Sequence, residues 1–271
     1  MTEVLAFGEA RCGDIRVAGG KGASLAAMTV AGFAVPPGFV LPADALAERV
    51  DAEQLRRLTR AQDWRSAQGL VRTAEAPLDE IAKAYERLGA GLVAVRSSAC
   101  AEDSEAASFA GQQETYLHVQ GAEEVAARVI DCWASFFSER ALFYRARKGS
   151  VDDLAMAVVV QCMVEAETSG VVFTVDPVQR RRDRMVVEAV SGLGEQVVSG
   201  AVTPEHYVLD REGAVRHERL RNGGVLGAEE LRRLAELGRA LEERFGRPQD
   251  IEWAIAGGEI YLLQSRPVTT L

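Results

Sequence analysis

Two patterns of apolar and polar positions divide the sequence. Between residues 43 and 89, apolar side chains recur every three or four positions, as a helix with one buried face requires. The clearest case is the segment 78–88, where one face consists of Leu78, Ile81, Ala82, Tyr85 and Leu88. We expect three or four amphipathic helices there, followed by a long helix over residues 122–149 that breaks near Ser138.

Short apolar runs bounded by glycine, proline or polar residues predict strands in both halves. In the first half these runs are residues 4–7, 91–99 and 113–119, together with an extended crossing at 36–42 and a helix entered through glycines at 20–32. The second half is rich in strands and contains one helix, at 228–246. Its strands are expected at residues 154–164, 170–177, 184–190 and 205–210 and in a closing hairpin, 250–267.

This change of pattern predicts an α+β protein with two lobes. We place a helix-rich N-terminal lobe at residues 1–163 and a sheet-rich C-terminal lobe at residues 164–271, with a cleft between them. The apolar run 158–164 lies at the point of change. It is therefore expected to connect the lobes.

Composition narrows the class of protein. The chain has 271 residues, of which 48% are hydrophobic and 26% charged, as in an ordinary globular protein. Its net charge of -9 argues against a nucleic-acid partner, although a single cleft can still be basic. No apolar run reaches the roughly 18 residues of a membrane span, and the N-terminus lacks a signal-peptide pattern, so a cytoplasmic protein is expected. The four cysteines form no C-x-x-C pair, which predicts free thiols.

The closing hairpin, DIEWAIAGGEIYLLQSRP, carries four polar side chains in an otherwise apolar ribbon: Asp250, Glu252, Gln264 and Arg266. A two-residue turn at Gly257-Gly258 sets Glu252 opposite Leu263 and mixes polar and apolar side chains on both faces. A three-residue turn instead pairs Asp250 with Arg266 and Glu252 with Gln264. We favour the second register, in which the core face consists of Ile251, Trp253, Ile255, Tyr261 and Leu263.

The polar face of this hairpin has the chemistry of a magnesium and phosphate site. The carboxylate of Glu252 and the amide oxygen of Gln264 suit Mg²⁺, which takes one or two protein ligands and completes its shell with phosphate oxygens. Arg266 beside them can hold a further phosphate oxygen. The alternative is a common Asp–Arg cross-strand pair on a solvated sheet, and the hairpin taken alone favours this alternative.

Two stretches of the first half have features of an anion site. The segment GGKG, residues 19–22, offers backbone N–H groups at the start of a helix, with Lys21 as a compact charge. Arg96 ends a buried strand and precedes a loop of small and polar residues, 97–110, that is able to fold over phosphates. The alternatives are a glycine-rich turn and a surface loop. Arg96 counts against the latter, because a charge after four apolar residues needs an anionic partner.

Two stretches near the change of pattern contain further candidate residues for a ligand site. The run VVVQCMVEAETSG, residues 158–170, can present a backbone edge to an adenine, with residues 162–164 lining an apolar slot. Alternatively, its valines are simply core. The glycine-rich segment 191–207 either aims Glu195 into the cleft or is a plain loop.

Six motifs taken in order over residues 19–267 resemble the nucleotide-binding domain of the phosphoenolpyruvate synthase and pyruvate phosphate dikinase family, to which rifampicin phosphotransferase also belongs. They are GGKGASLAAM, GFAVPPGFVL, VAVRSSACAEDSEAASFAGQQETYL, SGVVFTVDP, GLGEQVVSGAVTP and DIEWAIAGGEIYLLQSRP. The resemblance implies an ATP-grasp fold whose two lobes clamp ATP. It also reverses the preference at the hairpin, in favour of a magnesium site.

The resemblance implies which residues bind the phosphates of ATP. Lys21 and Arg96 would bind phosphate oxygens in the first lobe, beneath a loop that runs through Ser108 and Gly111. Arg266 would hold the terminal phosphates from the second lobe. Such groups position the nucleotide and neutralise developing charge, which is most of what phosphoryl transfer requires of a protein.

The same resemblance implies the adenine and metal contacts. The backbone near Gln161, Met163 and Val164 would read the adenine, and Glu252 and Gln264 would ligate Mg²⁺. Two further acids would assist: Asp250 beside the metal, and Glu195 reaching in from the second lobe.

In this family the β-phosphoryl of Mg·ATP passes to a histidine on a separate swivelling domain, with release of AMP and phosphate. The 271 residues contain neither that domain nor an acceptor domain, so the resemblance implies a split-system subunit or an excised domain. The expected partners are therefore a phosphohistidine-domain protein and an acceptor-binding protein or domain, with no nucleic acid and no membrane. Two alternatives remain open: a non-catalytic nucleotide-binding module, and an ATP-grasp ligase that joins a carboxylate to an amine.

Overall fold

The computed structural model describes residues 3–100, 114–148, 152–193, 202–221 and 223–269. By its internal contacts the chain divides into two units. The first comprises Met1–Ala31 and Pro37–Met163, and the second comprises Gly32–Pro36 and Val164–Leu271. The first unit holds most of the helices and the second holds the larger sheet, so the predicted α+β class is confirmed.

A five-stranded antiparallel sheet with the order β1-β2-β5-β3-β4 forms the centre of the first unit. Its strands are Leu5–Ala6, Gly38–Leu41, Val93–Ala99, Thr115–Val119 and Met156–Cys162, numbered β1 to β5 in chain order. The helices are η1 (Ala10–Gly13), α1 (Ile15–Val30), α2 (Ala52–Arg60), α3 (Trp64–Val71), α4 (Leu78–Arg87), α5 (Ala122–Ser135) and α6 (Glu139–Lys148). The predicted break near Ser138 is therefore confirmed, as the gap between α5 and α6.

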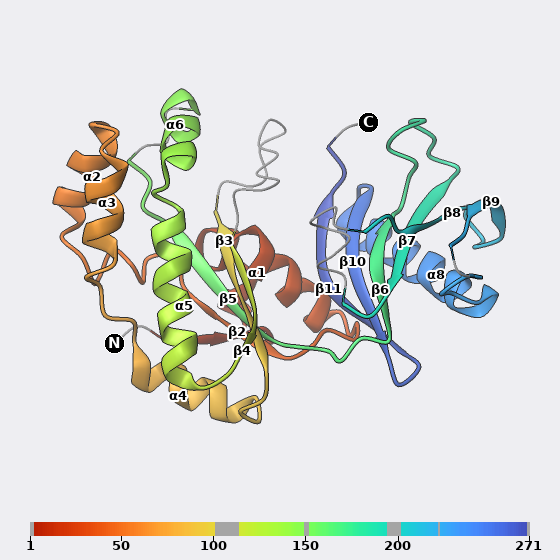
Figure 1. Ribbon diagram of the computed structural model, residues 1–271, viewed down its shortest axis with the longest axis horizontal. Helices are drawn as coiled ribbons and strands as arrows, with labels where there is room; N and C mark the ends of the chain where they lie inside the picture. Colours follow the sequence, from red (N-terminus) through yellow and green to blue (C-terminus); the bar gives the residue numbers. More distant parts are fainter. Residues whose placement is uncertain (1–2, 101–113, 149–151, 194–201, 222, 270–271) are drawn as a thin grey trace. The chain divides into compact units, whose positions relative to one another are not determined.

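Helices cover both faces of this sheet, with α5 across one face and α1 against the other (Figure 1). Val129 and Trp133 of α5 join Val95 and Val158 in the main hydrophobic core. On the opposite face Gly22 of α1 packs against the side chains of Val40 and Val159. Because both faces are covered, every residue of β3 is buried, including three polar ones.

The second unit is a six-stranded antiparallel sheet with the order β11-β10-β6-β7-β8-β9. Its strands are Thr168–Phe173, Met185–Ser191, Glu205–Leu209, Val215–Arg219, Gln249–Ala256 and Glu259–Pro267, numbered β6 to β11 in chain order. Helix α8 (Ala228–Phe245) packs on one face, where its Gly238 lies against Met185 and Thr174. The face shared by Met185, Val187 and Ile251 is thus the core, and the alternate residues form the opposite face.

The closing hairpin corrects the predicted register in part. Asp250 pairs with Arg266 and Glu252 with Gln264, as predicted, but beyond Glu252 the register shifts and Trp253 pairs with Leu262. The ribbon ends in a two-residue turn at Gly257-Gly258, both with positive φ, where a three-residue turn was predicted.

The physical reason is a β-bulge, in which Leu263 is the extra residue on β11. A bulge allows the polar pairing at one end of the ribbon and the tight glycine turn at the other end. The predicted core positions Tyr261 and Leu263 are consequently only half-buried. Ile260 and Leu262 are buried in their place, with 3% and 1% of their surface exposed.

The helices in the described parts of the chain include none with the length and apolar character that crossing a membrane requires.

Candidate functional site

A kink at Gly19 divides α1 just before the predicted lysine. Gly19 has φ 68° and ψ 173°, outside the helical region, although helical residues flank it on both sides. A Cβ atom at this position would lie 2.2 Å from the carbonyl oxygen of Ser98. The sequence therefore needs glycine here, because only glycine combines this φ with such close approach to another backbone.

The kink is held by the end of β3. The Ser98 hydroxyl donates to the carbonyl oxygen of Ala18 at 2.8 Å and accepts from the N–H of Gly22 at 3.1 Å, which bridges the interruption. Lys21 is 6% exposed, and its Nζ donates to the carbonyl oxygen of Ser97 at 3.1 Å. This hydrogen bond between distant segments holds Lys21 at the end of β3, the strand that also carries the predicted Arg96.

Arg96 and Gln161 lie on the face of the first sheet that α1 covers. Arg96 pairs with Val159 across β3 and β5, and Gln161 pairs with Ala94 on one side and with Gly38 on the other. Both polar side chains are buried, at 9% and 3% exposure. The backbone of Gln161 therefore lies inside the sheet, between two paired strands.

The end of β5 has the backbone groups that were predicted to read an adenine. The N–H of Cys162 donates to Pro37 at 2.9 Å, and that of Met163 donates to Leu92 at 3.0 Å, so both are already engaged. Within the described residues, the N–H of Val164 has no hydrogen-bond partner. Val164 is therefore the predicted adenine residue whose donor remains available.

The polar face of the second sheet brings four predicted residues together. Arg266 donates through Nε to Asp250 Oδ2 at 2.8 Å, and the neighbouring cross-strand pair is Glu252 and Gln264. Asp250 and Gln264 are each only 8% exposed. The carboxylate of this ion pair is therefore buried, whereas the side chain of Arg266 is 55% exposed.

Burial also gives Asp250 unusual electrostatics. Desolvation raises the pKa of its carboxyl group, the charges of Glu252 and Glu188 raise it further, and Arg266 opposes both. Oxygen Oδ1 of Asp250 is buried and has no hydrogen-bond partner in the described part of the chain. A face with this excess of carboxylate oxygens would be stabilised by a cation.

We expect Asp250→Asn to change how stability depends on pH in metal-free buffer. A raised pKa means that the folded state holds its proton longer than the unfolded state, so the wild type loses stability as pH rises from about 4 through the raised value. The asparagine variant lacks this loss. The difference in unfolding temperature, variant minus wild type, should therefore increase between pH 4 and pH 7 in EDTA.

Asp210→Asn serves as a control of opposite sign. Burial raises the pKa of Asp210, but hydrogen bonds from Ala214 and Arg216 outweigh it, so the pKa is lowered on balance. Removing this carboxylate should cost more stability as pH rises through the acidic range. A pH-independent difference for Asp250→Asn would contradict the assignment of a buried, destabilising charge.

Glu188 belongs to the same polar face and was not predicted. It lies in one row across the strands with Val171 and Glu252, and its Oε1 is 3.6 Å from Nδ1 of His206. In the sequence, the feature that could have indicated Glu188 is its place as the single acid among the valines and alanine of RMVVEAV. An acid in such a strand faces either solvent or a polar site.

Three predicted residues lie outside the described residues: Ser108, Gly111 and Glu195.

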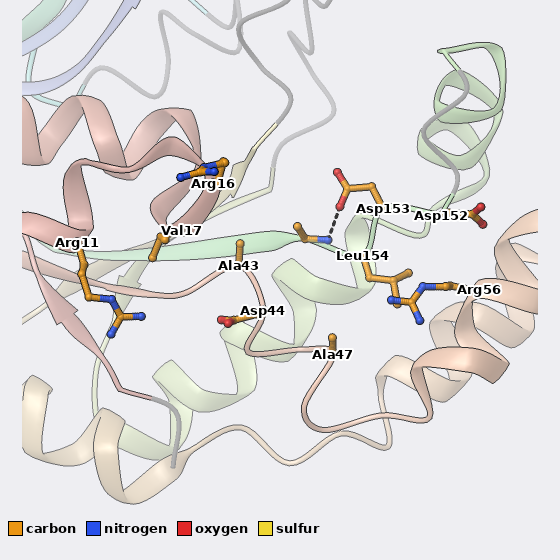
Figure 2. Close-up of a pocket in the computed structure, with 11 residues that line it drawn as sticks. Arg11, Arg16, Val17, Ala43, Asp44, Ala47, Arg56, Asp152, Asp153 and Leu154 are labelled. Atoms are coloured by element: carbon orange, nitrogen blue, oxygen red, sulfur yellow. Dashed lines mark hydrogen bonds between the residues drawn. The ribbon is translucent and has the colours of Figure 1, made fainter.

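A separate pocket of about 280 Å³ opens in the first unit (Figure 2). It is lined by Arg11, Arg16, Val17, Ala43, Asp44, Ala47, Arg56, Asp152, Asp153, Leu154 and Ala155. Arg11 and Arg16 are engaged in exposed ion pairs with Glu3 and Asp14. No predicted site residue lines this pocket, so it is distinct from the candidate site.

Comparison with known proteins decides the family. Residues 15–222 and 212–271 match the family described as "Pyruvate phosphate dikinase, AMP/ATP-binding domain". The chain belongs to this family. The helices and antiparallel sheets described above agree with the α+β class that the sequence predicts.

Individual relatives of this dikinase-type domain are longer proteins. The chain is 42% identical to a probable phosphoenolpyruvate synthase of Archaeoglobus fulgidus, over 95% of this chain and 40% of that protein. It is 40% identical to rifampicin phosphotransferase of Streptomyces sviceus, over 95% of this chain and 35% of that protein. The chain thus spans less than half the length of these relatives.

A solved structure of "ATP-grasp ligase PsnB complexed with minimal precursor" aligns with 93% of the chain and 52% of its own, at 11% identity and a TM-score of 0.36. A likeness at this level supports no inference about this domain.

Proposed function

We propose that the chain is the ATP-binding component of a phosphoenolpyruvate synthase-like phosphotransferase. In this proposal the β-phosphoryl of Mg·ATP passes to a histidine on a separate domain or protein, with release of AMP and phosphate. The observation that carries it is the pairing of Asp250 with Arg266 and of Glu252 with Gln264 on one polar face, in a chain of the dikinase ATP-binding family.

The residues of this face fit a magnesium ion. Glu252 supplies a carboxylate and Gln264 an amide oxygen, and Mg²⁺ commonly takes one or two protein ligands besides phosphates and water. Within the described residues no group of three or more His, Cys, Asp or Glu side chains could hold a metal alone. A site with so few protein ligands suits an ion that arrives with the nucleotide. When bound, such an ion would neutralise phosphate charge.

The remaining residues would position the nucleotide. Lys21 and Arg96 in the first unit would bind phosphate oxygens, as would Arg266 in the second. Met163 and Val164 would hold the adenine, with the free N–H of Val164 as a donor to a ring nitrogen. Gln161 would contribute through its side chain, since its backbone is paired within the sheet.

The predicted roles of Ser108, Gly111 and Glu195 remain part of the proposal. Ser108 and Gly111 would cover the phosphates, and Glu195 would act from the second unit. Asp250 would support the metal by holding Arg266 and adding negative charge next to Glu252. Together these groups would orient ATP and stabilise the charge that develops during transfer.

Labelled ATP tests the proposal. The full chain is incubated with Mg²⁺ and either β-labelled or γ-labelled ATP, alone and with candidate proteins that carry a phosphorylatable histidine. The proposal predicts acid-labile label on the partner from β-labelled ATP only, with AMP as the nucleotide product. ATP binding without transfer to any partner would support a regulatory module, and ADP with an acyl phosphate would support a ligase.

A further inference from the structure

Strand β4 contains an irregularity next to the end of β5. Val93 pairs with Val119 and Val95 with Tyr116, so two residues of β4, Leu117 and His118, lie opposite the single residue Ala94. His118 has φ 57°, in the left-handed region that non-glycine residues rarely adopt. The arrangement is a β-bulge, a feature that re-aims the groups it contains.

The bulge directs the N–H of His118 at the side chain of Met163. The N–H donates to Met163 Sδ at 3.0 Å. The thioether is a weak acceptor, but this contact restrains the most flexible end of the side chain. The backbone N–H of Met163 is also fixed, because it donates to Leu92 at 3.0 Å. Met163 is therefore held at both its main chain and its sulfur by the first unit.

We propose that His118 is a positioning residue that fixes Met163 as a rigid wall against the nucleotide base, and so makes the domain prefer adenine to guanine. The inference rests on the proposed function, which places the base beside Met163. A methionine normally adapts its three rotatable bonds to whatever it contacts. With its sulfur held, the Met163 side chain keeps one conformation. Guanine, whose exocyclic groups differ from those of adenine, then fits against it less well.

The conformation of His118 gives a graded set of variants. Asparagine tolerates the left-handed region and should preserve the bulge, whereas the β-branched Val is strained there. Met163→Leu removes the sulfur acceptor while keeping a similar volume. Met156→Leu, at a buried position in β5, the strand that Met163 follows, is the matched control for exchange of a methionine.

The measurement is the ratio of the dissociation constants for GTP and ATP, obtained with the full chain by displacement of a fluorescent nucleotide. We expect His118→Val and Met163→Leu to lower this ratio about three- to tenfold, the effect of one modest contact. His118→Asn and Met156→Leu should keep the wild-type ratio. In nucleotide-free protein, Met163→Leu should also shift the amide proton resonance of His118, which reports the N–H···S contact directly.

The outcomes separate this inference from the function on which it rests. If the wild type binds ATP but Met163→Leu retains both the GTP:ATP ratio and the His118 amide shift, the positioning role is overturned and the proposed function stands. If His118→Val fails to fold, Met163→Leu still decides the matter. If the wild type binds neither nucleotide, the proposed function and this inference fall together.

Discussion

Glu252→Ala is expected to reduce Mg·ATP-dependent phosphoryl transfer by about 10²- to 10³-fold, the loss typical of removing one group that stabilises transition-state charge. The fold should survive, because Glu252 lies on the face opposite the core residues Ile251 and Trp253. The expected change in unfolding temperature is within about 2 °C, as for substitutions away from the core. AMP release and thermal unfolding of the same preparation measure the two effects.

Glu259→Ala is the matched control for this substitution. Glu259 is an exposed acid on the same hairpin, where it forms a 3.6 Å ion pair with Arg233. Its loss should change neither transfer nor stability measurably, because exposed ion pairs contribute little. Unfolding of the Glu252→Ala protein would show that the polar face is structural. Retention of wild-type transfer would show that Glu252 does not ligate the metal.

Gly19→Ala is expected to destabilise the protein by roughly 3 kcal/mol or more, combining a positive φ with a buried clash. The new Cβ would meet the backbone carbonyl of Ser98 at 2.2 Å, and backbone yields less readily than a side-chain end. Relief requires α1 to move away from β3. That movement breaks the hydrogen bond from Lys21 to Ser97, so nucleotide affinity should fall along with stability. Chemical denaturation and nucleotide titration measure both.

Gly69→Ala provides the control for glycine replacement. Gly69 lies in α3, and a Cβ there meets no atom within 4 Å. The Gly69→Ala substitution should stabilise the fold by up to about 1 kcal/mol, because alanine has a higher helix propensity than glycine. If Gly19→Ala is as stable as this control, the kink does not depend on glycine.

Local patterns predicted most of the elements. The run 91–99 contains the buried strand β3, and the helical spacing around Leu78 gives α4. The hairpin pairing of Asp250 with Arg266 followed from separating polar from apolar faces. Strand β9 was missed because its five residues, VRHER, are all exposed at a sheet edge and contain only one apolar side chain.

What the sequence did not predict arises from contacts between distant segments. The bulge at Leu263 lets the same hairpin bury its core residues and close through a two-residue glycine turn. Strict alternation of polar and apolar residues along one strand does not predict such a bulge. Ser97 and Ser98 belong to the segment 97–110 that was predicted as a loop able to fold over phosphates, yet their oxygens bind Lys21, Ala18 and Gly22 of α1. The place of Glu188 on the polar face and the contact that holds the sulfur of Met163 likewise depend on contacts between segments far apart in the sequence.

We propose above all that the polar face built from Asp250, Glu252, Gln264 and Arg266 binds the metal of Mg·ATP. A crystal structure with Mn²⁺ and a non-hydrolysable ATP analogue tests it most directly, because anomalous scattering locates the ion. We expect Mn²⁺ within direct coordination distance, roughly 2 Å, of oxygens of both Glu252 and Gln264, with a phosphate oxygen in the same shell. A bound nucleotide whose metal lies elsewhere, with these side chains directed into solvent, would contradict it.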